Sequence, residues 1–233
     1  MDPGDRPPLK VNLRRHSTRE GLDDGHHKGR RLPAQILWRL VSAAVFVNPV
    51  VHSYALKRAL LRMFGARIGA GVLIKPGVKI SYPWHLTIGD YSWIGESAWL
   101  DSTSPLSIGK HAVISQGAYL CCGKHDWSDP GMGSVSAPIT VEDGAWVAAF
   151  ARVAGDVTIG QEAIVALGAV VFTDCEPRGT YQGNPARRVG TRRIRDDVGP
   201  KRPPPVRRRG RRVEPEPPET LLDEVPTARC AAS

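Results

Sequence analysis

The sequence predicts an all-β fold, a parallel β-helix built from hexapeptide repeats. An aliphatic residue returns at every sixth position from Val141 to Val171, and a small or β-branched residue follows each of them four positions later. A period of six matches neither the 3.6 of a helix nor the alternation of an ordinary strand. It is typical of a solenoid in which each hexapeptide forms one side of a three-sided coil. The low aromatic content, 6%, also suits a core of Val, Ile and Ala.

The N-terminal part predicts a helical cap in front of the β-helix. Residues 1–31 cluster charge, Gly and Pro without periodicity, which is typical of disorder. In residues 32–64, an apolar run over 34–47 is followed by a second helical pattern that places Leu56, Leu60 and Phe64 on one face. The apolar run is shorter than the about 20 residues that span a bilayer. Two roles stay open for this segment: covering the first coil, or peripheral contact with an anionic membrane surface through residues 34–64.

Residues 65–175 are predicted to form the β-helix, with roughly six coils. The aliphatic period runs through this whole range, and its phase shifts by two residues at 82–85 and again at 102–105. Short insertions at a corner of the coil explain these shifts. The interval from Leu120 to Val141 is 21 residues, which is not a multiple of six. It therefore predicts an excursion away from the coil, and loops on a rigid scaffold are where function concentrates.

The C-terminal part predicts a closing segment over 176–195 and a disordered, basic, Pro-rich tail over 196–233. Twelve Lys/Arg lie in residues 187–212, so the net charge of +9 belongs mainly to this region. We expect a solvated tail rather than a specific nucleic-acid site. Four cysteines without a CxxC pattern fit a reducing cytoplasm, and the first thirty residues show no apolar secretion signal.

His125 is the candidate for acid–base chemistry, because among the seven histidines it alone lies in the predicted excursion. An imidazole can take a proton from a hydroxyl and pass it to a leaving group. Asp126 or Asp129 is near enough in sequence to orient the ring, although a backbone carbonyl would serve equally. A plain surface histidine is the alternative. No metal is expected, because His85, His111 and His125 lack the tight pair and no CxxC is present.

Four motifs carry a resemblance to a known family: Thr-Ile-Gly-Asp-Tyr-Ser-Trp-Ile-Gly at 87–95, Gly-Lys-His-Asp at 123–126, Gly-Ala-Trp-Val at 144–147 and Gly-Asn-Pro-Ala at 183–186. With the repeats, they resemble the hexapeptide-repeat acyltransferases, in particular the colanic-acid-biosynthesis type. The resemblance implies a left-handed β-helix assembled as a homotrimer with active sites between subunits. It implies acetyl-CoA as donor, a sugar hydroxyl as acceptor, free or lipid-linked, and a place in cell-surface polysaccharide biosynthesis.

The resemblance also assigns site residues. His125 matches the catalytic base, with Asp126 beside it, and the acceptor side is assigned to Ser102 and Trp127. The donor site is assigned to Trp146, Ala148, Ala149, Gly168, Ala169, Asn184, Pro185, Ala186 and Arg187. Two positions depart from the family pattern: Phe172-Thr173, where relatives carry Thr-Lys near the donor, and Ser102, where many relatives carry Asn on the acceptor side. An N-acyltransferase acting on an amino-sugar, or a β-helix scaffold without catalysis, are the alternative functions.

Overall fold

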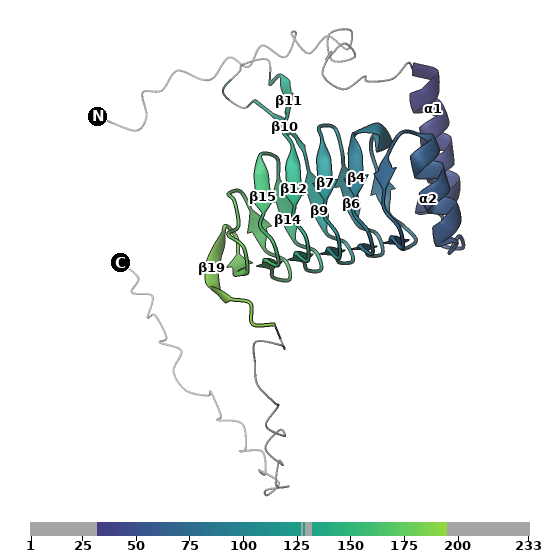
Figure 1. Cartoon of the computed structure of the whole chain (residues 1–233). Coiled ribbons are helices and arrows are strands. Elements are labelled where there is room, and N and C mark those ends of the chain that lie inside the picture. Colours follow the sequence, from purple (N-terminus) through teal and green to yellow (C-terminus); the bar gives the residue numbers. More distant parts are fainter. Residues whose placement is uncertain (1–31, 127, 129–131, 195–233) are drawn as a thin grey trace, which may run out of the picture. The chain divides into compact units, whose positions relative to one another are not determined.

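The computed structural model describes residues 32–126, 128 and 132–194 as a three-sided solenoid closed at one end by helices (Figure 1). The tails predicted for 1–31 and 196–233, together with Trp127 and Asp129, lie outside the described residues. Three parallel sheets, here named A, B and C, form the sides of the solenoid. The predicted parallel β-helix is therefore confirmed.

Each sheet collects one strand from every coil. Sheet A contains β1 (Arg67–Ile68), β4 (Leu86–Ile88), β7 (Leu106–Ile108), β12 (Ile139–Val141) and β15 (Val157–Ile159). Sheet B contains β2 (Leu73–Ile74), β5 (Trp93–Ile94), β8 (Val113–Ile114), β13 (Trp146–Val147), β16 (Ile164–Val165), β18 (Gly179–Gly183) and the antiparallel β19 (Ala186–Thr191). Sheet C contains β3 (Lys79–Ile80), β6 (Trp99–Asp101), β9 (Tyr119–Cys121), β14 (Arg152–Ala154) and β17 (Val170–Val171).

The hexapeptide period produces this stacking because it places the same residue type at the same point of every coil. In sheet B the aliphatic positions pair directly from coil to coil, and all are buried: Ile74, Ile94, Ile114, Val147 and Val165. Each such burial is worth about 1.5–3 kcal/mol relative to exposure. Small residues fill the space between these rows, with Ala112, Ala118, Ala145, Ala151 and Ala163 fully buried.

The solenoid has five complete coils and the start of a sixth, in line with the roughly six expected. The sixth coil consists of a bridge from Cys175 to Ile159 and the pairing of β18 with β16, after which β19 folds back. The chain leaves the hexapeptide period at Pro177.

All insertions occur at the corner where the chain passes from sheet C to sheet A, here named corner CA. It holds residues 81–85, including a 3-10 turn (Pro83–His85), residues 102–105, and the long excursion between β9 and β12. Within the excursion, β10 (Gly123–His125) and β11 (Ser134–Ser136) form an antiparallel hairpin that projects from the solenoid (Figure 1). The corner from sheet B to sheet C, named corner BC, keeps tight turns such as residues 148–151 and 166–169.

Two helices and a π-helical turn cover the first coil: α1 (Leu32–Val41), the turn Ser42–Val47 and α2 (Tyr54–Met63). Trp38, Phe46, Leu61 and Phe64 are buried against this end, and the Trp38 indole donates a 3.0 Å hydrogen bond to the Ile80 carbonyl. The two short predicted helices are thus present. No helix in the described part of the chain has the length and apolar character to cross a membrane.

The face of α2 that packs on the coil agrees only in part with the predicted one. Phe64 is buried and Leu60 packs partly buried against the core, as expected. Leu56, however, is 44% exposed, whereas Lys57 is completely buried beside Leu61. The Lys57 ammonium donates to the carbonyls of Ile74 and Lys75, both at 3.2 Å. Carbonyl oxygens at the end of the solenoid need donors, and the long lysine side chain supplies them, so a residue expected outside is drawn in.

Candidate active site

His125 lies on the exposed hairpin with one ring nitrogen fixed. In β10 it pairs with Ser134 of β11, and its Nδ1 lies 2.9 Å from the Met132 carbonyl oxygen. A carbonyl can only accept, so Nδ1 carries the proton and donates it. In the neutral ring the Nε2 lone pair is then left as a base, which is the arrangement that a general base requires.

Asp126 shapes the turn that follows His125. Its N–H donates to the Gly133 carbonyl at 2.9 Å, and its carboxylate accepts hydrogen bonds from the N–H and the hydroxyl of Ser128. Of the two orienting groups considered for the ring, the Met132 carbonyl is the one that bonds Nδ1. A catalytic role for Asp126 itself stays a prediction.

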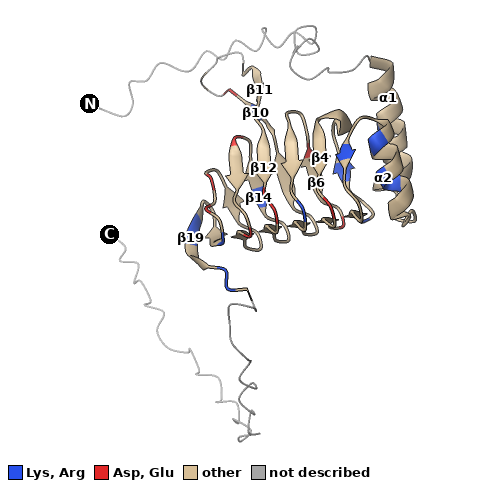
Figure 2. Ribbon diagram, in the orientation of Figure 1, with Lys and Arg blue, Asp and Glu red and all other residues tan. Residues whose placement is uncertain are grey.

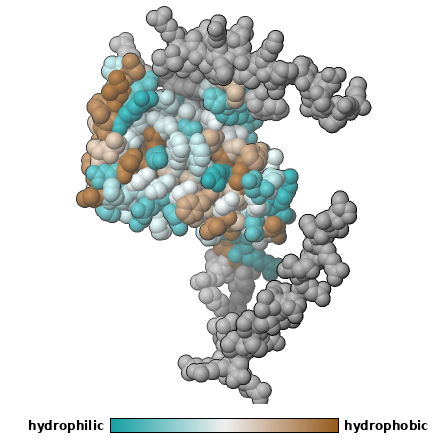
Figure 3. All heavy atoms as spheres, turned by 180° about the vertical axis from the view of Figure 1, so that it is seen from behind, coloured by the Kyte–Doolittle hydropathy of each residue, from teal (hydrophilic) through white to brown (hydrophobic). Residues whose placement is uncertain are grey.

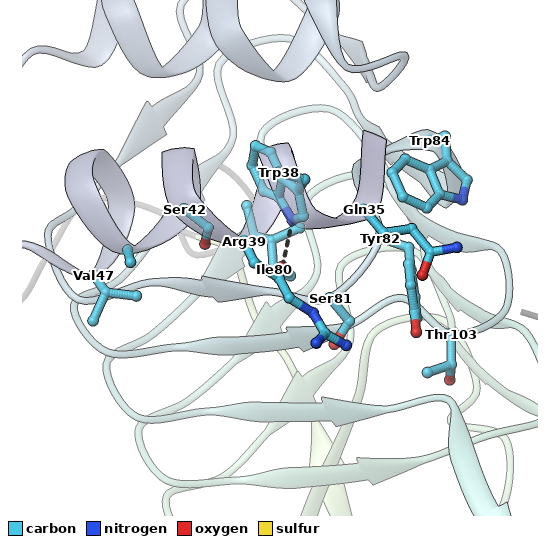
Figure 4. A pocket seen from close by; sticks show the side chains of 11 residues that line it. Gln35, Trp38, Arg39, Ser42, Val47, Ile80, Ser81, Tyr82, Trp84 and Thr103 are labelled. Carbon is cyan, nitrogen blue, oxygen red and sulfur yellow. Dashed lines mark hydrogen bonds between the residues drawn. The ribbon is translucent and has the colours of Figure 1, made fainter. Parts of the chain in front are cut away.

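A pocket of about 340 Å³ lies at corner CA, between the helical cap and the solenoid (Figure 4). From α1, Gln35 and Arg39 reach toward Ser81 and Tyr82, and Trp84 stands at one side. The buried indole N–H of Trp84 has no hydrogen-bond acceptor in the described part of the chain. Aromatic surface with a few polar groups is the usual composition of a small-molecule site. The sequence could not assign this pocket, because its walls come from segments more than 60 residues apart.

His125 emerges from the same corner. Gly123, at the base of the hairpin, is so close to the preceding corner loop that an added Cβ would lie 3.3 Å from both Asp101 Oδ2 and Thr103 Oγ1. Thr103 also lines the pocket. The strand carrying the imidazole and the pocket therefore start from adjacent loops of corner CA.

Ser102, predicted on the acceptor side, is fully buried beneath this corner. Its hydroxyl accepts from the Tyr82 N–H at 3.0 Å and donates to the Tyr82 carbonyl at 2.8 Å. The hydroxyl is thus occupied by the protein backbone, and Ser102 supports the loop that carries Tyr82 and Trp84. Any influence on an acceptor is exerted through that loop.

The residues predicted for the donor lie along sheet B and corner BC. Trp146 is 41% exposed on β13, and its indole donates to Ser115 Oγ at 2.9 Å. Ala148 and Ala149 lie in the turn that follows β13. In the next coil, Gly168 lies at the corresponding turn, and its N–H donates a hydrogen bond to the Ala149 carbonyl. Gly168 has φ of +68°, and a Cβ there would meet open space. Beside them, a second pocket of about 540 Å³ runs along sheet B past Trp93 and Trp146.

The remaining residues predicted for the donor site differ in their exposure to solvent. Ala169 is fully buried in the core and Ala186 nearly so, so their side chains pack inside the protein, and a role in the donor site stays a prediction. Asn184 and Pro185, joined by a cis peptide bond, form the exposed tip of the β18–β19 hairpin, and Arg187 follows it. This hairpin extends sheet B, so the exposed candidates share one side of the solenoid.

The structure therefore separates the predicted site into two parts. His125 and the cap pocket lie at corner CA, whereas the small residues lie at corner BC, with the whole width of sheet C between the two corners. Within one chain, the base and the donor residues do not meet.

Known proteins are similar to this chain in sequence and in fold. WcaF of Escherichia coli (strain K12), whose name assigns it to colanic acid biosynthesis as an acetyltransferase, is 40% identical over 162 residues, covering 70% of this chain and 88% of WcaF. The chain belongs to the hexapeptide-repeat acetyltransferases. A galactoside acetyltransferase solved with coenzyme A matches with a TM-score of 0.62 at 22% identity, covering 70% of this chain and 83% of its own.

A second solved relative of this acetyltransferase is VCA0836 of Vibrio cholerae, a hexapeptide-repeat acetyltransferase complexed with acetyl coenzyme A. It matches with a TM-score of 0.58 at 24% identity and covers 61% of this chain and 80% of its own. No protein-family model matches the sequence. Within the described part of the acetyltransferase, no three His, Cys, Asp or Glu side chains are grouped to hold a metal ion.

Proposed function

We propose that this acetyltransferase moves an acetyl group from acetyl-CoA to a sugar hydroxyl, with His125 as the general base. The observation that carries the proposal is the fixed ring of His125: its Nδ1 proton is held by Met132, and Nε2 is left as a base on a hairpin beside an aromatic pocket. A saccharide, free or lipid-linked, suits the cap pocket, because sugars bind aromatic faces and hydrogen-bonding side chains together. The relative WcaF, named for colanic acid biosynthesis, supports a role in cell-surface polysaccharide biosynthesis. A cytoplasmic location is part of the proposal.

The reaction needs no covalent enzyme intermediate. His125 Nε2 takes the proton of the acceptor hydroxyl as its oxygen attacks the acetyl carbonyl carbon. The new C–O bond forms, the C–S bond of the thioester breaks, and the proton passes from the imidazole to the departing sulfur. Backbone N–H groups would stabilise the oxyanion formed in between.

A homotrimer supplies what one chain lacks. If the hairpin at corner CA of one copy reaches sheet B of its neighbour, His125 meets Trp146 and the turn Ala148–Ala149 of that neighbour. These residues fit a pantetheine arm, because small side chains and the open position at Gly168 let a thin chain approach the backbone. Arg187 is exposed on the closing hairpin, which leaves its guanidinium accessible to the nucleotide phosphates of the donor in this proposal.

The first test replaces His125 by Ala and measures acetyl transfer from acetyl-CoA to a panel of sugar and amino-sugar acceptors. Loss of the base should lower kcat by about 10²–10⁴-fold. His111→Ala is the matched control, because His111 stacks on Tyr91 at the sheet A to sheet B corner, away from both parts of the site. Equal activity of the two variants would remove His125 from the mechanism, and exclusive transfer to amines would change the acceptor class.

A further inference from the structure

The helical cap presents an apolar outer face. Along α1 and the π-helical turn, Gln35, Trp38, Ser42 and Phe46 face inward and are buried. Exposed apolar residues of these two elements, at 41–66% of each residue, are Leu32, Ile36, Leu37, Leu40 and Val47, and Val50 follows the turn with 79% exposed. We call these six residues the outer face. Leu56 and Met63 add exposed apolar side chains from α2, and hydrophobic residues gather over this end of the molecule in Figure 3.

The same end carries only positive charge. Residues 32–89, which form the cap and the first coil and lead into the second, contain seven Lys or Arg and no Asp or Glu. Lys57 is buried, so six of the seven are available at the surface. The first acidic residue of the described chain is Asp90, and Figure 2 shows no acidic residue on the two cap helices. Arg39 is the single charged residue of α1. The end of the solenoid is therefore both apolar and cationic.

We propose that the outer face docks on an anionic phospholipid bilayer, with α1 lying in the plane of the interface. An apolar helix face combined with basic residues is the pattern of interfacial helices, where buried apolar area and attraction to anionic lipids add together. A second copy of this end is a poorer occupant, because two cation-only surfaces would repel each other.

Docking in this orientation also places the cap pocket at the bilayer surface. The buried residues Gln35 and Trp38 of α1 line that pocket together with the exposed Arg39, while the outward apolar residues of the same helix would contact lipid. Insofar as the proposed function holds, a pocket at the bilayer surface favours a saccharide carried on a lipid over a saccharide free in solution. The docking itself is independent of acetyl transfer.

The test measures binding of the full-length protein to vesicles without acetyl-CoA or acceptor. Vesicles of phosphatidylcholine with phosphatidylglycerol are compared with phosphatidylcholine alone. The wild type should bind the anionic vesicles, and the double variant L37E/L40E should raise the Kd about tenfold or more, because it puts charge into the apolar contact. Val189→Glu is the matched control: Val189 is equally exposed, at 60%, but lies on β19 beyond the last coil. Its Kd should stay unchanged.

The basic tail needs its own control, since Arg207–Arg212 alone attracts anionic lipid. A full-length variant with these arginines changed to Ser should retain binding that L37E/L40E abolishes. A dye attached to L40C should shift its emission to the blue on anionic vesicles, which tests the same contact without added charge. Absence of wild-type binding, loss of binding in the tail variant alone, or an unshifted dye overturns the proposal. The proposal is also overturned if L37E/L40E binds vesicles as the wild type does but has a different oligomer mass. The outer face would then be a contact between copies of the chain.

Discussion

Cys122 shows how strongly burial sets chemistry at single residues of this solenoid. It is fully buried at the base of the excursion, three residues before His125. Burial raises the pKa of its thiol to about 12, because the charged thiolate loses its solvation. Near neutral pH the thiol is protonated and a poor nucleophile. This protonation state argues against Cys122 as an acyl carrier, in agreement with the proposed direct attack by the acceptor hydroxyl.

Cys122→Ala should therefore keep kcat within about twofold, since the small side chain only fills a corner of the coil. Steady-state acetyl transfer measures the effect, and a mass spectrum of the protein quenched during turnover should show no acetylated chain. A loss comparable to that of His125→Ala, with an unchanged Tm, would contradict direct attack.

Lys57 defines the helical cap as an element. Its ammonium bonds two carbonyls at the open end of the first coil and lies 6.0 Å from the centre of the Phe46 ring. Arg58 and Arg62 of the same helix donate to the carbonyls of Val72 and Ile68. Basic side chains of α2 thus satisfy the backbone that stacking leaves unpaired, and the helix serves as a cap of the kind that repeat proteins need.

Lys57→Met should lower the free energy of unfolding by about 1–3 kcal/mol, because two buried carbonyls lose their donor. Urea unfolding measures this, with Lys79→Met as control: Lys79 is exposed on sheet C and lies over Trp99, so its loss should cost less than about 1 kcal/mol. Equal effects would contradict the capping role.

The same substitution has a pH signature. Burial lowers the pKa of Lys57 from its ordinary value of 10.5. The folded chain then binds fewer protons than the unfolded chain between the lowered pKa and 10.5, so this group's contribution to stability rises with pH across that window. The difference in unfolding free energy between wild type and Lys57→Met should accordingly grow as pH rises toward 10.5.

At the scale of the whole molecule, the hexapeptide period allowed the solenoid, its corner insertions and the excursion to be predicted, because stacked coils require the same residue type at the same point of every turn. The burial of Lys57 escaped prediction, since amphipathic spacing treats lysine as a solvent residue. A backbone carbonyl was one of the groups expected to orient the His125 ring, but that Met132 supplies it escaped prediction, because it lies seven residues away. The cap pocket escaped because α1 and corner CA meet only after folding.

Because corners CA and BC are separated within one chain, the central claim is that each active site combines His125 of one copy with the donor residues of another. Mixed trimers test this claim most directly. His125→Ala chains are co-expressed with Gly168→Asp chains, in which a carboxylate blocks the donor side at a position whose backbone Asp tolerates. Each variant alone should be inactive. If base and donor residues come from different copies, random mixing leaves both intact at about a quarter of the sites, and the mixture should recover about that fraction of wild-type activity. A mixture as inactive as its two parents would contradict the account, because it would place each complete site within a single chain.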